Sequence, residues 1–136
     1  MTFAIKVHVA NPKARSFDFT SQKTMYGGKR IAAGDTIFIF DSENDGGGGL
    51  IASGIVTSAK PTPRKPGVER QTPRVSIKVT RTARAQQPMG RAELKRFSNW
   101  GDGRPESELN FKFYRQATNK IVGISDAAAA FLRRFC

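Results

Sequence analysis

Residues 31–42 read IAAGDTIFIFDS, a turn followed by residues that strongly favour a strand. Gly34 and Asp35 are typical turn residues. The next five residues, Thr36 to Phe40, are β-branched or aromatic, and both types favour strands. Their nearly continuous apolar character predicts a strand that is buried on both faces. A strand with two buried faces needs packing partners on each side, so it belongs at the centre of a domain.

The residues after this strand predict a hairpin. Residues 41–49 include four consecutive glycines, which favour a flexible loop or hairpin tip. Residues 50–59 regain strand character, and Gly54 within them is a candidate bulge. Two strands around a glycine-rich tip predict an antiparallel pair.

Alternation of apolar and polar residues predicts several further strands. They cover Phe3–Val9, Val75–Arg81 and Ile121–Ile124. Leu109–Phe113 also alternates and is predicted to be a strand or an arm before a strand, with Phe111 and Phe113 facing the core. The remaining segments read as loops and short helices. Residues 13–30 are polar and predict a loop or short helix anchored by Phe17 and Phe19. A short helix is predicted over Gly90–Phe97. Lys60–Pro73 contains four prolines, which predict an exposed loop.

The C-terminal segment Ser125–Phe135 predicts a helix, because Ser125 is a favoured N-cap and Asp126 suits the first turn. With 136 residues, the chain has the length of one domain. We therefore expect a single domain over residues 1–136. Its predicted class is mainly β or α+β: a small mixed β barrel with flanking helices.

The charge of the chain points to an anionic partner. Lys and Arg number 23 against 11 Asp and Glu, a net charge of +12. Residues 60–96 alone hold eleven basic and two acidic residues. A localised basic stripe is typical of proteins that bind the phosphate backbone of nucleic acids. A solvated face, or contact with an acidic protein, would also account for it.

Other classes are disfavoured by composition. No apolar run approaches the length of a membrane span, and no signal peptide is recognisable, so we expect a cytoplasmic protein that does not bind membranes. The only cysteine is Cys136 and the only histidine is His8. A disulfide, a zinc site or a His-dependent catalytic site is therefore not expected, and neither is a cofactor.

Aromatic residues near basic ones are the main candidates for contact with bases. Trp100 lies in a Gly/Asp-rich turn, where it serves either as a stacking platform or as a cap on the core. Lys112, Tyr114 and Arg115 are expected on a polar surface. The Gly-rich segment from Tyr26 to Arg30 lacks the pattern of a P-loop.

Three segments in order resemble EVE and YTH domains of the PUA-like superfamily. They are the opening FAIKVH, the stretch IAAGDTIFIFDS with the following IASGIV, and KIVGIS before the last helix; together they span most of the chain. The resemblance implies a PUA-like pseudo-barrel and a module that reads a modified base in DNA or RNA. By that resemblance Lys6 and Ser42 occupy ligand-facing positions.

The sequence thus predicts a non-enzymatic nucleic-acid-binding module. Candidates for a base pocket are Lys6, His8, Tyr26, Ser42 and Trp100; candidates for phosphate contact are Lys29, Arg30, Arg64, Lys65, Arg70, Arg74, Lys78 and Arg104. One alternative is a metal-independent enzyme on RNA or nucleotides, resembling ASCH proteins, with Tyr26, Lys29 and Arg30 stabilising charge. The chain lacks the glutamate that follows the ASCH lysine, which counts against this alternative. A small structural domain that binds a protein partner is the other.

Overall fold

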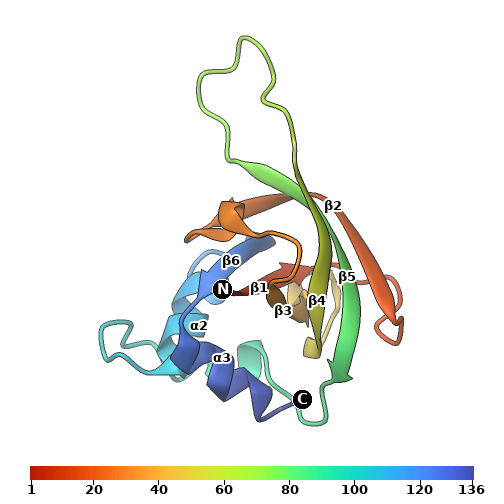
Figure 1. Ribbon diagram of the computed structural model, residues 1–136. Helices are drawn as coiled ribbons and strands as arrows, with labels where there is room; N and C mark the ends of the chain where they lie inside the picture. The colour runs from red at the N-terminus through yellow and green to blue at the C-terminus, as the bar shows by residue number, and fades with distance from the viewer.

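The computed structural model describes all 136 residues. Six strands close into a barrel in the order β1-β3-β4-β5-β2-β6. Helices cover one side of this barrel (Figure 1). The strands are β1 (Thr2–Val7), β2 (Ser16–Met25), β3 (Thr36–Asp41), β4 (Gly49–Pro61), β5 (Arg74–Arg84) and β6 (Lys120–Ile124). The helices are α1 (Arg91–Leu94), α2 (Pro105–Tyr114) and α3 (Asp126–Arg133), with the short 3-10 turns η1 (Gly28–Arg30) and η2 (Glu43–Asp45). The predicted small mixed barrel with flanking helices is confirmed.

Strand β3 is buried on both faces, as predicted. Ile37 and Ile39 point into the barrel core. Phe38 and Phe40 point outward into a second core between the barrel and the helices, where the Phe40 ring lies 5.1 Å from that of Phe113 on α2. The two cores explain why this segment is apolar at consecutive positions rather than at alternate ones.

The hairpin around the glycine-rich tip is also confirmed, because β3 and β4 pair in antiparallel fashion. Gly54 lies at a register shift between β4 and β5, as its position in the strand predicted. Strands β4 and β5 extend past the barrel and are joined by a projecting loop, residues 62–73, which we call the arm (Figure 1). The arm coincides with the predicted proline-rich basic loop.

Two segments differ from the sequence prediction. Residues 13–30 were expected to form a loop or short helix, but they contain β2, whose Phe17 and Phe19 face the core while Asp18 between them faces solvent. Leu109–Phe113 was expected to be a strand or an arm before a strand, but it is part of the helix α2. Leu109 and Phe113 are four residues apart, so they share one helix face, and both are fully buried. Phe111, expected in the core, is only half-buried on the other side.

The C-terminal helix forms as predicted. The Ser125 hydroxyl accepts a hydrogen bond from the Ala128 N–H at 3.1 Å, which makes it the N-cap of α3. None of the helices combines the length and the apolar character required to cross a bilayer. No group of three or more His, Cys, Asp or Glu side chains is placed to hold a metal ion.

Candidate nucleic-acid interface

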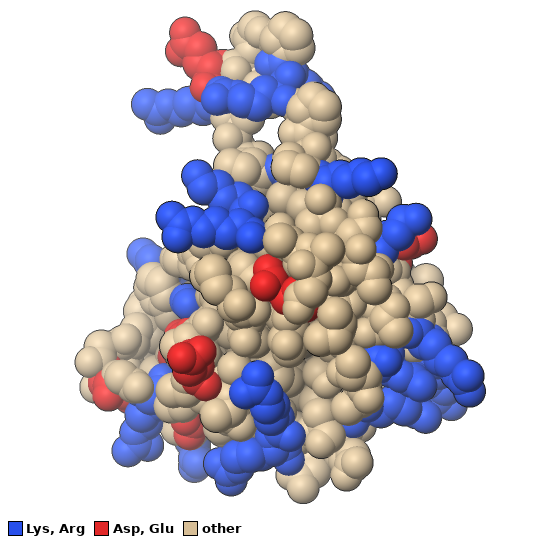
Figure 2. Space-filling view, in the orientation of Figure 1, with Lys and Arg blue, Asp and Glu red and all other residues tan.

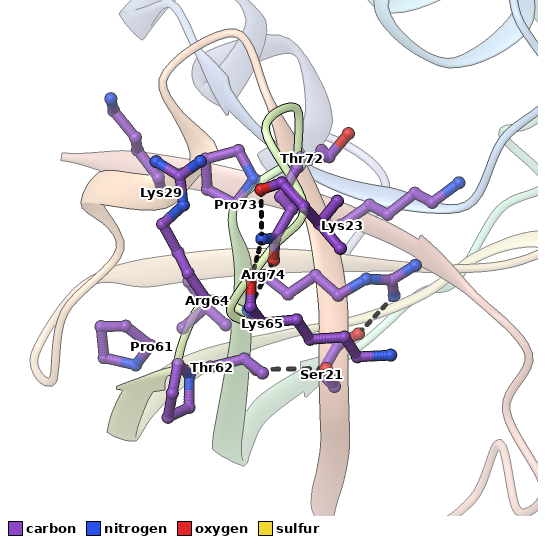
Figure 3. A pocket seen from close by; sticks show the side chains of 14 residues that line it. Ser21, Lys23, Lys29, Pro61, Thr62, Arg64, Lys65, Thr72, Pro73 and Arg74 are labelled. Atoms are coloured by element: carbon purple, nitrogen blue, oxygen red, sulfur yellow. Dashed lines mark hydrogen bonds between the residues drawn. The ribbon is translucent and has the colours of Figure 1, made fainter.

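A cleft of about 760 Å³ lies where the arm joins the barrel. Among its fourteen lining residues five are cationic and none is acidic: Lys23, Lys29, Arg64, Lys65 and Arg74. They come from β2, η1, the arm and β5, so the fold brings together residues that are far apart in the sequence (Figure 3). Such a cleft attracts anions.

A bulge in β2 ties the arm to the barrel at this cleft. The β2–β5 register shifts between Phe19 and Gln22, and Ser21 takes a φ of 50°, an uncommon value for a residue other than glycine. Its N–H donates to the Ser76 hydroxyl at 2.8 Å, its carbonyl accepts from the Arg74 guanidinium at 2.7 Å, and its hydroxyl lies 3.1 Å from that of Thr62. These bonds hold Arg74 and the root of the arm against β2 (Figure 3).

Hydrogen bonds within the arm give it a defined shape. The Gln71 side chain accepts from the Lys65 N–H at 2.9 Å and donates to the carbonyls of Lys65 and Val68 at 2.7 and 3.0 Å. The Arg64 guanidinium donates to the Glu69 carbonyl at 3.0 Å. The cations of the arm are therefore presented by an ordered loop, which lowers the entropy lost when a ligand binds.

The charges of the cleft have no acidic partners. The three ion pairs of the molecule are Met1–Asp35, Arg104–Asp102 and Lys112–Glu108, and all lie outside the cleft. Figure 2 shows Lys and Arg side chains on the arm and on the barrel surface next to its base. The five cations thus remain available to an external anion.

A shallower cleft of about 400 Å³ adjoins the first and shares Lys23 and Arg74 with it. Its other walls are polar and include Gln22, Asn44 and Asn119. The Asn119 amide donates to Asp45 at 3.1 Å, and its oxygen accepts from the Ser42 hydroxyl at 2.8 Å. Side-chain amides both donate and accept hydrogen bonds, so this cleft has the chemistry to recognise the edge of a base.

Two lysines are completely buried near this polar cleft. The Lys6 ammonium donates to the carbonyls of Phe113 and Ala117 at 2.9 and 3.2 Å, and the Lys120 ammonium to those of Gln116 and Thr118 at 3.0 and 3.2 Å. Burial and the nearby charge of Lys120 lower the pKa of Lys6 to about 8. Burial likewise lowers the pKa of Lys120. The segment 113–118 therefore wraps around both ammonium groups.

Tyr114 closes the same region from α2. Its hydroxyl donates to both carboxylate oxygens of Glu43 at 3.1 Å, and its ring lies 5.0 Å from the Lys6 ammonium. Burial and the Glu43 charge raise the pKa of Tyr114. Tyr114 was expected on a polar surface, but its interactions fix it beside the buried lysine.

Three aromatic rings form a separate cluster on the helical side. The Phe111 ring lies 5.5 Å from that of Tyr26 and 5.4 Å from that of Trp100. Trp100 is 44% exposed and Tyr26 37%. The fold thus brings together two base-contact candidates, Tyr26 and Trp100, that are distant in the sequence.

The remaining candidates are dispersed. Lys6 and Ser42 are buried, whereas His8 is exposed just beyond the end of β1. Four of the phosphate candidates line the cleft at the base of the arm: Lys29, Arg64, Lys65 and Arg74. The other four lie elsewhere. Arg70 is on the arm, Arg30 is on η1, Lys78 is on β5 opposite Asp18 of β2, and Arg104 is paired with Asp102.

The sequence prediction missed Lys23 and the amides of Gln22, Asn44 and Asn119. Lys23 and Gln22 lie on β2, which was predicted to be a loop or short helix, so neither the position of Lys23 in both clefts nor that of Gln22 in the polar cleft could be predicted. Asn44 lies on η2 and Asn119 directly before β6, far apart in the sequence, and the closed barrel brings them together. Alternation along β2 between Phe17 and Phe19 was the one available signal.

No protein-family model matches the chain, and no curated protein sequence is similar to it. Solved structures do share its fold. The DUF55 domain of human thymocyte nuclear protein 1 superposes with a TM-score of 0.63 at 13% identity, covering 96% of this chain and 95% of that one. Human THYN1 in complex with DNA containing 5-methylcytosine gives a TM-score of 0.63 at 15% identity, over 96% and 94% of the two chains. A hypothetical protein from Leishmania major gives 0.62 at 15% identity, over 98% and 92%. The chain therefore shares the fold of these DUF55 and THYN1 structures.

Proposed function

We propose that this protein binds nucleic acid through the arm cleft and recognises a modified base at the adjoining polar cleft, without catalysing a reaction. The observation that carries the proposal is the arm cleft itself, where five cations from four elements converge with no acidic residue among the lining side chains. Each cation that neutralises a phosphate releases condensed counterions, which is the main source of sequence-independent affinity.

The polar cleft supports the second half of the proposal. It shares Lys23 and Arg74 with the arm cleft, so a backbone held by these two side chains would run past the amides of Asn44 and Asn119. Phosphate contacts position a nucleic acid, whereas contacts with base edges distinguish sequences and modifications. A structural neighbour of this chain was solved with DNA containing 5-methylcytosine, which makes that base the first probe to test.

The lining of both clefts favours binding over catalysis. The arm cleft contains no carboxylate and no imidazole, the groups that most often act as general bases. The polar cleft has one carboxylate, Asp45, and this accepts a hydrogen bond from Asn119. Tyr26, Lys29 and Arg30, the charge-stabilising set of the enzymatic alternative, therefore lack a neighbouring general base in either cleft.

The test compares two fluorescently labelled DNA duplexes that differ only in one central cytosine, methylated or not. Fluorescence anisotropy at low and at physiological salt gives four dissociation constants. We expect both duplexes to bind, both affinities to fall steeply with salt, and the methylated duplex to bind more tightly. The DNA recovered after incubation in chelator should be unchanged in length and in methylation.

Each part of the proposal has its own contrary outcome. Absence of binding at low salt, or affinity independent of salt, would contradict nucleic-acid binding. Equal affinities for the two duplexes, and for RNA and hydroxymethylated counterparts, would contradict recognition of a modified base. Cleaved or demethylated DNA would show an enzyme. Asn119→Ala should reduce discrimination between the duplexes, and thermal unfolding of that variant checks that the barrel is intact.

A further inference from the structure

The cluster of Tyr26, Phe111 and Trp100 lies outside both clefts and forms a row of rings. Phe111 stands in the middle, tilted at 53° to Tyr26 and at 67° to Trp100. Such tilted and edge-to-face contacts are favourable for aromatic pairs. The two outer rings are also the most exposed aromatic side chains of the protein.

Each outer ring is held in place. The Trp100 indole N–H donates to the Asn110 amide oxygen at 3.2 Å, and the buried Asn110 amide donates in turn to the Leu94 carbonyl at 2.7 Å. Tyr26 has a φ of 52°, and its carbonyl accepts from the Gly123 N–H on β6 at 3.1 Å. Tyr26 and Ser21 are the only residues other than glycine with positive φ, and such strained positions often coincide with binding sites.

An unpaired cation accompanies the rings. The Arg115 guanidinium lies 5.1 Å from the Phe111 ring and 5.7 Å from the Trp100 ring. It takes part in none of the three ion pairs and is exposed. Lys112, which lies 5.9 Å from the Tyr26 ring, is by contrast bound to Glu108 and to the Gly123 carbonyl. Arg115 is therefore the cation that an anionic ligand would meet here.

We propose that Tyr26, Phe111, Trp100 and Arg115 form a second binding surface, on which an unpaired base of a single-stranded nucleic acid stacks while Arg115 contacts its phosphate. The inference rests on the proposed nucleic-acid binding and extends it. Bases stack on aromatic rings irrespective of sequence, and a neighbouring guanidinium supplies the charge that the backbone requires. Tyr26 is linked to the arm cleft through Gly27 and Gly28, which lead to Lys29 on the cleft wall. Three residues span at most about 11 Å, so a nucleic-acid strand leaving the cleft would have only a short distance to cover to reach Tyr26.

The protein reports on this contact by itself, because Trp100 is its only tryptophan. A single-stranded oligothymidine is titrated into the intact protein while the Trp emission and the anisotropy of a label on the oligonucleotide are recorded together. We expect saturable quenching of the emission over the concentrations at which the anisotropy rises. A fully paired duplex should bind through the arm cleft without quenching. Oligodeoxyuridine and oligouridine, which differ only in the sugar, show whether the sugar matters.

Substitutions test the energetic contribution of the rings. Trp100→Ala should weaken binding of the single strand roughly 5- to 150-fold, the range for loss of one stacked base. Trp100→Phe should retain most of the affinity, because it keeps a ring. Duplex binding should stay the same in both variants. Phe97→Leu is the matched control, since Phe97 is another ring beside an arginine, with the Arg96 guanidinium 4.9 Å away.

Several results would overturn the inference. Emission that stays constant at saturating single strand shows that no base reaches Trp100. Equal quenching by duplex and single strand shows that the contact does not require an unpaired base. An equal loss of affinity in Phe97→Leu shows a general effect of substitution. If Trp100→Ala does not fold, the emission of the wild-type protein still shows whether a base reaches Trp100. If the duplex does not bind but the single strand still quenches the Trp100 emission, binding of nucleic acid at the arm cleft is contradicted, while stacking of a base on the rings is supported.

Discussion

Removing two cations of the arm should flatten the salt dependence of DNA binding by a predictable amount. If all five cations of the arm cleft meet phosphates, the slope of log affinity against log salt is about −4.5 for a duplex, at about −0.9 per phosphate. Arg64→Gln with Lys65→Gln leaves three contacts and a slope of about −2.7. Between about 50 and 200 mM salt the affinity of the wild-type protein should then fall about 500-fold, and that of the double variant about 40-fold.

The assay is anisotropy of a labelled unmodified duplex at four or more salt concentrations. The matched control is Lys95→Gln with Arg133→Gln, which removes the same charge from two exposed side chains on the helical side of the barrel. Its slope should stay near that of the wild type. Neither arm residue packs in the core, so both double variants should retain the stability of the wild-type protein.

Two results would refute the reasoning. If both double variants change the slope equally, net charge governs binding and the arm cleft is not the phosphate track. If the arm variant keeps the wild-type slope, the backbone passes elsewhere, and the other basic residues of the barrel become the interface. A lower slope with the control unchanged would place phosphates in the arm cleft.

Three further predictions concern stability. Folding lowers the pKa of Lys6 from 10.5 to about 8, so the unfolded state binds more protons between these values, and this group should raise the free energy of unfolding with pH across that window by at most about 3 kcal/mol. Because burial lowers the pKa of Lys120 as well, urea denaturation of Lys6→Met should show a smaller rise than that of the wild-type protein. Ser125→Ala removes the N-cap of α3 and should cost about 1 kcal/mol, seen as a lower melting temperature. Gly28→Ala would place a methyl group against the Ile121 carbonyl and should cost about 1–3 kcal/mol in urea denaturation, whereas Gly48→Ala, which meets open space, should cost less.

Local sequence patterns predicted the elements whose signal is contained in a few consecutive residues. Strand β3 is recognisable because Thr36 to Phe40 are all strand formers, and the Ser125 cap because a hydroxyl and then an acidic residue, Asp126, come directly before the apolar run 127–132. The helix α2 was misread because Leu109 and Phe113 fit a period of two and a helix face equally well. Pro105 at the first helical position, with Glu106 after it, was the signal that favoured a helix.

The site was predicted less well than the fold, for a different reason. The basic residues of the arm were recognisable in the sequence as a concentration of positive charge. A cleft also requires a second wall, opposite the arm. That wall is β2, whose position depends on antiparallel pairing with β5 and on the bulge at Ser21. Neither pairing partner nor bulge is encoded by residues near Ser21 in the sequence. The register between β2 and β5, which are distant in the sequence, therefore determines which cations meet in the arm cleft, and it places Lys23 among them.

The buried lysines indicate where base recognition takes place in the proposed function. For a base to touch Lys6, the segment that follows α2 would have to move, because the Ala117 carbonyl is one of the two acceptors of the Lys6 ammonium. Lys120, bound to the Gln116 and Thr118 carbonyls, would lose its acceptors in the same movement. Two buried ammonium groups without hydrogen-bond partners would cost far more than a surface rearrangement. The amides of Asn44 and Asn119 line a cleft that is already open, so in the proposed function a base would meet them first, while Lys6 holds the Ala117 carbonyl in the wall of that cleft.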